Sequence, residues 1–304
     1  MQTLTQLLDS ITIGPPQTLN GVRVFPLLSD KSESRAFLEL DEALEKQLAE
    51  VTEVSDSGSV PQLIVINHSQ QDIIIFDGEQ LIGAKQNRIV NITVIVPANS
   101  TLPIPVSCVE QGRWHYSSPT FAAADACAYP SLRVSKHRDV TENLRNRRRS
   151  DADQSNIWND ISAKASRMEV ASGTMAMADI FEKKAPDPEM RRQTFIVAAN
   201  QVGYLAFIND GFAGGDIFGS ADVCRRKLEK LMRGYYLDSL DHGVAFDRVE
   251  VEEVFREVRA AEHHDFGTVG RGSEKRFEAM HVQGSWKEVD GWIPHLAILP
   301  KRVR

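Results

Sequence analysis

The sequence DGEQLIGAKQNR at residues 77–88, followed by the apolar run IVNITVIV at 89–96 and by CVEQGRW at 108–114, decides the fold of this chain. Charged and amide side chains here stand beside glycines and between hydrophobic runs. Apolar segments bounded by glycine, asparagine and aspartate are typical of strands joined by short turns. We therefore expect strands in this stretch, with a group of polar side chains held between them.

Further strands are predicted around this stretch. Residues 63–67 and 72–77 form two of them, joined by a hairpin loop at 68–71, and residues 89–96 and 102–109 form a third and a fourth. Pro103 and Pro105 restrict the last strand to an edge, a bulge or a strand end, because proline lacks the N–H that a ladder needs. Short connections favour antiparallel pairing.

The second half of the chain contains more helices. Apolar residues recur at helical spacing in 152–169, 221–236 and 249–262, and Asn209-Asp210-Gly211 is a tight-turn signal between two strands. Residues 276–299 indicate two or three closing strands. The predicted fold class is α+β, with a mostly antiparallel, β-rich N-terminal half packed against a helix-containing α+β C-terminal half.

We expect one domain over residues 1–304. A subdivision into a β-rich half at 1–135 and an α+β half at 151–304 is suggested by the arginine-rich segment 136–150, which reads as a linker or exposed loop. Trp158 favours one intimate unit, since this large side chain at the core-facing spacing of its helix needs a neighbour to pack on.

Composition bounds the function. The 304 residues are 42% hydrophobic and 25% charged, ordinary globular values, with a formal net charge of −7. An acidic balance argues against a nucleic-acid or anionic-membrane binder. The three cysteines are widely spaced, and the sequence has neither a signal-peptide pattern nor an apolar run of membrane-spanning length. A soluble cytoplasmic protein is expected, and the oligomeric state stays open.

Three residues are candidate catalytic groups. Glu79 and Glu110 are the acid/base candidates. Cys108 ends an apolar strand, where a cysteine is more often a small buried hydrophobic residue than a nucleophile. The nucleophile remains an alternative, because nearby cations lower the pKa of a thiol.

A second group of residues suits an anionic or sugar ligand. Cations neutralise charge, amides fix orientation, and an indole stacks on a ring. The ligand-binding candidates are Lys85, Gln86, Asn87, Arg88, Arg113, Trp114 and Gln154. The alternative is a turn with a solvated ion pair. No metal site is predicted, because adjacent His263 and His264 diverge and no metal-ligand spacing accompanies them. No cofactor is indicated.

The sequence resembles a bacterial family in four blocks. They are Gly58 to Leu63, Asp77 to Arg88, Pro105 to Trp114, and Asp153-Gln154 with Trp158. The family is the ARG and rhodanese-phosphatase-superfamily-associated protein domain, formerly a domain of unknown function. Weaker echoes are Gln201-Val202-Gly203, Asp216-Ile217-Phe218 and His295-Leu296. The family name implies an association with ADP-ribosylglycohydrolase, rhodanese and phosphatase-type proteins, and hence with ADP-ribose or phosphorylated nucleotides.

Two hypotheses result. In the first, the chain binds or processes a small anionic molecule containing ribose or phosphate, and Glu79, Glu110 and the cations converge on one pocket. In the second, the chain is a non-catalytic interaction or assembly module, and the same charges form a structural ion-pair network without an adjoining cavity.

Overall fold

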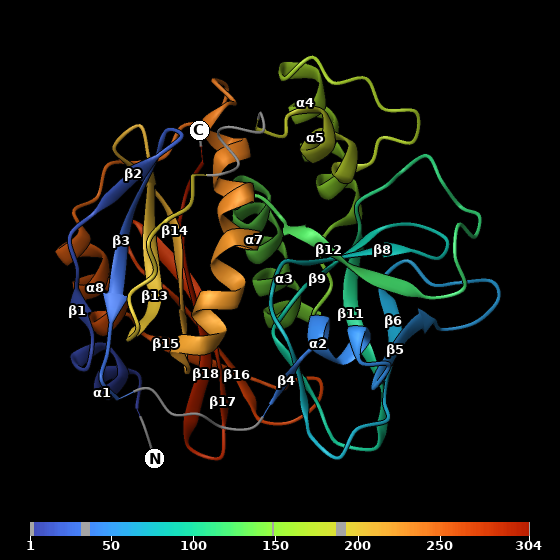
Figure 1. The fold of residues 1–304 in the computed structure, drawn as a ribbon, viewed down its shortest axis with the longest axis horizontal. Coiled ribbons are helices and arrows are strands. Elements are labelled where there is room, and N and C mark those ends of the chain that lie inside the picture. The colour runs from blue at the N-terminus through green and yellow to red at the C-terminus, as the bar shows by residue number, and fades with distance from the viewer. Residues whose placement is uncertain (1–2, 32–36, 148, 187–192, 304) are drawn as a thin grey trace.

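The computed structural model describes residues 3–31, 37–147, 149–186 and 193–303. In these ranges 18 strands form three sheets, accompanied by 7 helices. Figure 1 shows the largest sheet on one side, the two smaller sheets on the other, and helix α7 between them. The predicted α+β class with a β-rich N-terminal half is confirmed.

The largest sheet joins the two ends of the chain. Its strands are β1 (Thr12–Ile13), β2 (Gln17–Leu19), β3 (Val22–Leu28), β13 (Gln201–Ile208), β14 (Gly211–Phe218), β15 (His263–Phe266), β16 (Ser273–Glu278), β17 (Val282–Val289) and β18 (Trp292–Pro300). Their order is β1-β3-β13-β14-β18-β17-β16-β15, with β2 paired to β3. Because β3 pairs with β13, this sheet crosses the suggested division between residues 135 and 151.

The turn between β13 and β14 follows the sequence prediction. Asn209 and Asp210 have φ angles of +50° and +62°, which suit the two central positions of a type I′ hairpin. Such a turn matches the right-handed twist of the strands that it joins.

The two smaller sheets contain the organising stretch. A six-stranded sheet has the order β12-β8-β9-β11-β6-β5, and a three-stranded sheet has the order β10-β7-β4. The strands are β4 (Leu38–Glu39), β5 (Ala49–Glu53), β6 (Gln62–Asn67), β7 (Ile73–Ile75), β8 (Glu79–Gly83), β9 (Arg88–Val90), β10 (Val94–Val96), β11 (Ser100–Cys108) and β12 (Phe121–Cys127). Although β11 is internal, Pro103 and Pro105 lie in its first part, which pairs with β6 alone, so they interrupt no ladder on the other side.

The single strand predicted over residues 89–96 is wrong. The chain bends at Asn91-Ile92-Thr93 and continues from β9 into β10, which belongs to the other sheet. Side chains hold this bend: Asn91 Oδ1 accepts a hydrogen bond from Ser107 Oγ at 2.8 Å, and Thr93 Oγ1 accepts one from the backbone N–H of Asp77 at 3.1 Å.

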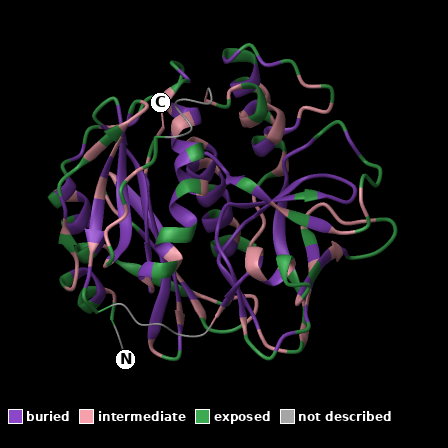
Figure 2. Ribbon diagram, viewed as in Figure 1, coloured by how far each residue is buried: buried purple, intermediate pink, exposed green. Residues whose placement is uncertain are grey.

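The described helices are α1 (Leu4–Asp9), α2 (Leu40–Glu45), α3 (Pro130–Arg147), α4 (Gln154–Arg167), α5 (Met177–Lys183), α7 (Ala221–Ser239) and α8 (Val251–Ala260). Helix α7 packs on β13 of the large sheet and on β12 of the six-stranded sheet. The strands around it are mostly buried (Figure 2). Helix α7 thus contacts both the large sheet and the six-stranded sheet.

The linker predicted over residues 136–150 is also wrong, although Arg145, Arg147 and Arg149 are exposed as expected. Most of it lies in α3, an 18-residue helix that contacts α4, α7, β14 and β18. Half of its buried residues are polar, including Arg133, Lys136 and His137, so hydrophobic periodicity did not reveal it. Arg148, part of that predicted segment, lies outside the described residues.

Candidate functional site

The two polar blocks of the organising stretch meet because of strand register. Residues 84–87 form the turn from β8 into β9, Arg88 begins β9, and residues 109–114 follow directly after β11. Strand β9 pairs with β11 so that Arg88 lies opposite Cys108. The turn is tight, since Gly83 and Ala84 both have positive φ angles of +126° and +38°. Antiparallel pairing therefore places both blocks at one end of the six-stranded sheet.

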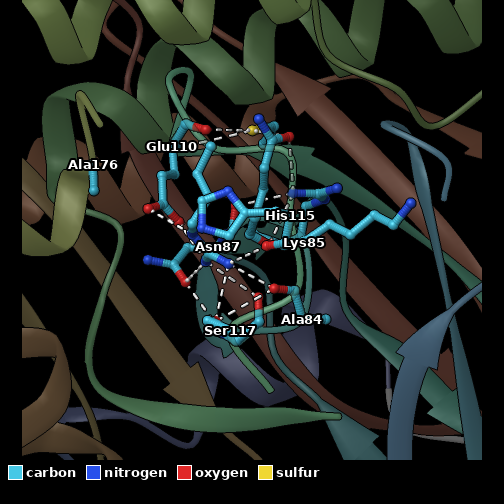
Figure 3. Close-up of polar contacts among 12 residues, drawn as sticks. Ala84, Lys85, Asn87, Glu110, His115, Ser117 and Ala176 are labelled. Atoms are coloured by element: carbon cyan, nitrogen blue, oxygen red, sulfur yellow. Dashed lines mark hydrogen bonds and ion pairs between the residues drawn. The ribbon is translucent and has the colours of Figure 1, made fainter. Parts of the chain in front are cut away.

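Glu110 and Arg113 form a closed pair inside this cluster. Arg113 Nε and Nη2 donate to the two carboxylate oxygens of Glu110 at 2.9 and 2.6 Å, and Nη1 donates to Ala84 O at 2.6 Å. The backbone N–H of Asn87 donates to Glu110 Oε2 at 3.1 Å. Figure 3 shows Glu110, Asn87 and Ser117 drawn together by these contacts, while the side chain of Lys85 extends away from them.

Electrostatics keep this pair ionised. Burial raises the pKa of Glu110, but the hydrogen bonds from Arg113 and from the Asn87 backbone together outweigh burial, and the pKa of this carboxyl is lowered. A carboxylate whose oxygens are occupied by a guanidinium and an amide is a poor proton acceptor. This pair therefore matches the mutual pairing that the structural-network hypothesis expects.

Arg88 contrasts with Arg113. Its side chain is 0% exposed, and Nη1 donates to Gln86 O at 2.9 Å and to Gln86 Oε1 at 3.3 Å. Its Nε and Nη2 have no hydrogen-bond partner within the described residues. Burial lowers the pKa of Arg88, although the neighbouring Cys108 and Glu53 act in the opposite direction. Buried guanidinium nitrogens are normally paired, so this empty edge needs an explanation.

Glu53, at the end of β5, faces this edge and was not selected from the sequence. Its Oε1 lies 3.9 Å from Arg88 Nη2 and accepts the backbone N–H of Lys85 at 3.2 Å. Its Oε2 is buried without a hydrogen-bond partner in the described part of the chain. The sequence gives no signal for Glu53. Its strand lies more than 30 residues before Lys85, and only the folding of the chain brings the two together.

Cys108 is a protonated thiol in this setting. Burial raises the pKa of the thiol, while the Arg88 charge partly offsets this. The Sγ donates to Gln86 Oε1 at 2.9 Å. Gln154, predicted as a ligand-binding residue, instead holds the Cys108 backbone: its Nε2 donates to Cys108 O at 2.8 Å, and its Oε1 accepts from Cys108 N at 2.9 Å.

An aromatic surface adjoins Arg88 and Lys85. Trp114 and Tyr116 are 45% and 47% exposed. Lys85 Nζ lies 5.5 and 5.1 Å from their ring centroids, and Arg88 Cζ lies 5.8 Å from the Trp114 ring. Lys85 Nζ also donates to the backbone carbonyl of Asp56. Cations beside half-exposed rings are suited to hold a ligand that carries both an anionic group and a ring.

Glu79 is not brought into this cluster. It accepts a hydrogen bond from Lys227 Nζ of α7 at 2.5 Å, and Lys227 also contacts Asp41 at 2.8 Å. Burial raises the pKa of Glu79, and the Lys227 charge offsets this in part. The predicted convergence of Glu79 with Glu110 is therefore not seen, and Glu79 belongs to an ion-pair network between α2, β8 and α7.

A further buried network joins the sheets. Arg133 of α3 donates to both oxygens of Asp216 at 2.9 and 2.7 Å. His295 lies between Asp216 Oδ1, at 3.0 Å from its Nε2, and Thr93 Oγ1, at 2.7 Å from its Nδ1. Burial raises the pKa of Asp216, but Arg133 and His295 outweigh this and hold it far below its usual range. Only the weak family echoes at residues 216 and 295 hinted at this network.

Cavities of 710 and 670 Å³ are lined by described residues. Neither lining includes Arg88, Cys108 or Glu110. Among the described side chains, three or more His, Cys, Asp or Glu residues nowhere form a group suited to a metal ion. None of the described helices is long and apolar enough to cross a membrane.

A family model described as the ARG and Rhodanese-Phosphatase-superfamily-associated Protein domain matches residues 10–299. The chain therefore belongs to this family, as the resemblance of its polar blocks predicted. No curated protein and no solved structure matches the chain.

Proposed function

We propose that this member of the ARG and Rhodanese-Phosphatase-superfamily-associated family binds a small anionic molecule containing ribose or phosphate beside Arg88. One observation carries the proposal. The Nε and Nη2 nitrogens of Arg88 form the edge of a guanidinium that holds an oxyanion through two parallel hydrogen bonds. In Arg113 the same edge is filled by hydrogen bonds to Glu110, whereas in Arg88 it has no hydrogen-bond partner among the described residues, and Glu53 lies 3.9 Å away.

The surroundings of Arg88 support this ligand class. Lys85 supplies a second cation, and Trp114 supplies a ring face on which a base or sugar can stack. Glu53 Oε2 needs a donor, and a ribose hydroxyl can donate to it while accepting from Arg88. Access would pass Trp114, because its half-exposed ring lies between solvent and the buried guanidinium.

The geometry supports binding more than processing. Glu110 is held by Arg113, Cys108 is a protonated thiol, and Glu79 lies in another network. The alternative function is a non-catalytic interaction or assembly module. Glu110 pairs with Arg113 and Glu79 pairs with Lys227, which favours that alternative for these residues. The two hypotheses therefore make different predictions only for Arg88.

A thermal-shift and calorimetric screen with ADP-ribose, ribose 5-phosphate and inorganic phosphate tests the proposal, since a ligand of the folded state raises Tm. Arg88→Lys keeps the charge but removes the two-pronged edge. Hydrogen bonds to a charged group contribute about 1.5–3 kcal/mol, so we expect at least a ~10-fold loss of affinity. The matched control is Arg145→Lys, in an exposed pair with Glu278.

Two results would overturn the proposal. The wild-type protein could show no Tm shift with any of these compounds, or Arg88→Lys could bind as tightly as the control. A loss of Tm in Arg88→Lys without any ligand response in the wild-type protein would favour the assembly module, because it would give Arg88 a purely structural role.

A further inference from the structure

The 710 Å³ cavity lies away from the Arg88 cluster, beside α7. Its walls come from α7, α5, the β2–β3 turn, the paired strands β8 and β12, and residues 184–186 and 193–197. Cavities of roughly 300–1,000 Å³ bind small organic ligands. The volume therefore suits a small organic ligand rather than a protein segment.

The body of this cavity is apolar. Ile82 of β8 is 39% exposed, although its neighbour Leu81 is fully buried in the core. Strand alternation turns Ile82 towards the cavity and Leu81 towards the core. Opposite Ile82 lie Phe181 of α5 and the α7 residues Leu228 and Met232. Such a surface takes a hydrocarbon or aromatic body.

Gln80 adds a polar requirement. It lines the cavity and shares the face of β8 with Ile82, because the two are separated by two positions. Gln80 is 3% exposed, and its side-chain nitrogen has no hydrogen-bond partner within the described ranges. A buried amide donor without an acceptor is costly to the folded protein, so an oxygen supplied by a ligand would satisfy it.

Arg233 of α7 also lines this cavity. It donates to Glu229 at 3.0 Å and reaches to within 3.8 Å of Asp125 on β12, the strand that pairs with β8. The side chains of Arg233, Glu229 and Asp125 are 45%, 71% and 92% exposed, so water screens both attractions and a ligand carboxylate can compete with Glu229 and Asp125 for Arg233. Arg233 and Gln80 together fit a carboxylate.

We infer that this cavity binds a carboxylic acid with an apolar body, such as a medium-chain acyl carboxylate, whose oxygen accepts from Gln80 and whose charge is balanced by Arg233. The hydrocarbon lies against Ile82, Phe181 and Met232. This site is independent of the one proposed at Arg88, since no lining residue is shared with the Arg88 cluster.

The experiment is calorimetric titration of the whole protein with decanoate and with decan-1-ol. We expect decanoate to bind and Gln80→Leu to weaken it at least tenfold, with a smaller effect on the alcohol. Because Gln80→Leu removes an unpaired buried amide, its Tm without ligand should equal or exceed that of the wild-type protein. Ala178→Trp on α5, which fills the cavity, should abolish binding, while the exposed control Ala260→Trp on α8 should not.

Three outcomes would overturn the inference. The wild-type protein could fail to bind decanoate, Ala178→Trp could bind as well as Ala260→Trp, or Gln80→Leu could lower Tm and leave the decanoate affinity unchanged. The last result would give Gln80 a structural role alone. Arg88→Lys should bind decanoate normally, so failure here is separate from failure of the nucleotide or ribose proposal.

Discussion

Replacing Glu110 by Gln tests whether the Glu110–Arg113 pair is structural. The change removes the charge and one oxygen that accept Arg113 Nε and Nη2, and it turns an amide donor towards the guanidinium. Breaking a buried ion pair costs about 3–5 kcal/mol. Arg113 keeps carbonyl acceptors at Ala84 and His115, so the lower end applies. We therefore expect the free energy of unfolding to fall by about 3 kcal/mol.

The assay is thermal unfolding of the ligand-free protein. For a chain of this size, 1 kcal/mol corresponds to roughly 2 °C, so Tm should fall by about 6 °C. Glu42→Gln is the matched control, because Glu42 pairs with Lys46 on the exposed face of α2 at 2.5 Å. Exposed helical pairs contribute about 0.3–0.5 kcal/mol, so this control should melt within about 1 °C of the wild type.

The pH dependence adds a second readout. The pKa of Glu110 is lowered in the folded protein, while an unfolded glutamate has a pKa of about 4.3. The contribution of this carboxylate is therefore present above about pH 4.3 and is lost as pH falls through its folded pKa. The Tm difference between wild type and Glu110→Gln should narrow below about pH 4. If Glu110→Gln melts like the control at neutral pH, the structural assignment of this pair is refuted and Glu110 becomes available for chemistry.

Further predictions concern other buried groups. Iodoacetamide should leave Cys108 unmodified at pH 7.5, because the side chain is 0% exposed and burial raises the pKa of the thiol; peptide mapping that finds rapid modification at pH 7.5 would show an accessible thiolate instead. Burial lowers the pKa of Lys287 to about 8, against about 10.4 when unfolded, so unfolding exposes a lysine that binds more protons between these values and stability should rise with pH there. The free energy of unfolding of Lys287→Met, measured by denaturant titration at pH 7.5 and 10, should lack this rise. An equal rise in the wild type and the variant would contradict the lowered pKa of Lys287. Asp216→Asn removes the nearer carboxylate of Arg133 and leaves Asp77, at 3.5 Å, as its remaining buried counter-charge, so the free energy of unfolding should fall by about 3 kcal/mol, the lower end for a broken buried pair; a change below about 1 kcal/mol would show that the network is not stabilising.

Local sequence patterns predicted much of the fold. The turn at Asn209 and Asp210 was predictable because its residue types tolerate positive φ angles. Helices α4, α7 and α8 carry apolar stripes at helical spacing, and β6 and β7 are short apolar runs. Helix α3 was missed, because the pattern rules assume an apolar buried face and half of the buried residues of α3 are polar, Arg133, Lys136 and His137 among them.

The candidate site was partly predictable. The sequence showed that residues 85–88 and 108–114 are unusually polar between strands, and the register of β9 and β11 brings them together. It could not show that Arg88 faces Glu53, or that Glu79 pairs with Lys227, 148 positions away. Both pairings depend on which strand or helix packs against which.

The sequence by itself determined many of the strands, the turn at Asn209-Asp210, most helices and the polar content of the organising stretch, because these depend on backbone preferences and on side-chain periodicity over a few residues. It did not determine the bend at residues 91–93, or that β6 and β7 lie in different sheets and do not form the predicted hairpin. The tertiary structure alone decided which charges are paired and which are not. The energy of a buried charge depends on its distance to partners and on its removal from water, and both are set by contacts between distant parts of the chain. Arg113 and Arg88 thus have the same side chain, but packing gives Glu110 to the first and leaves two nitrogens of the second without a hydrogen bond within the described residues.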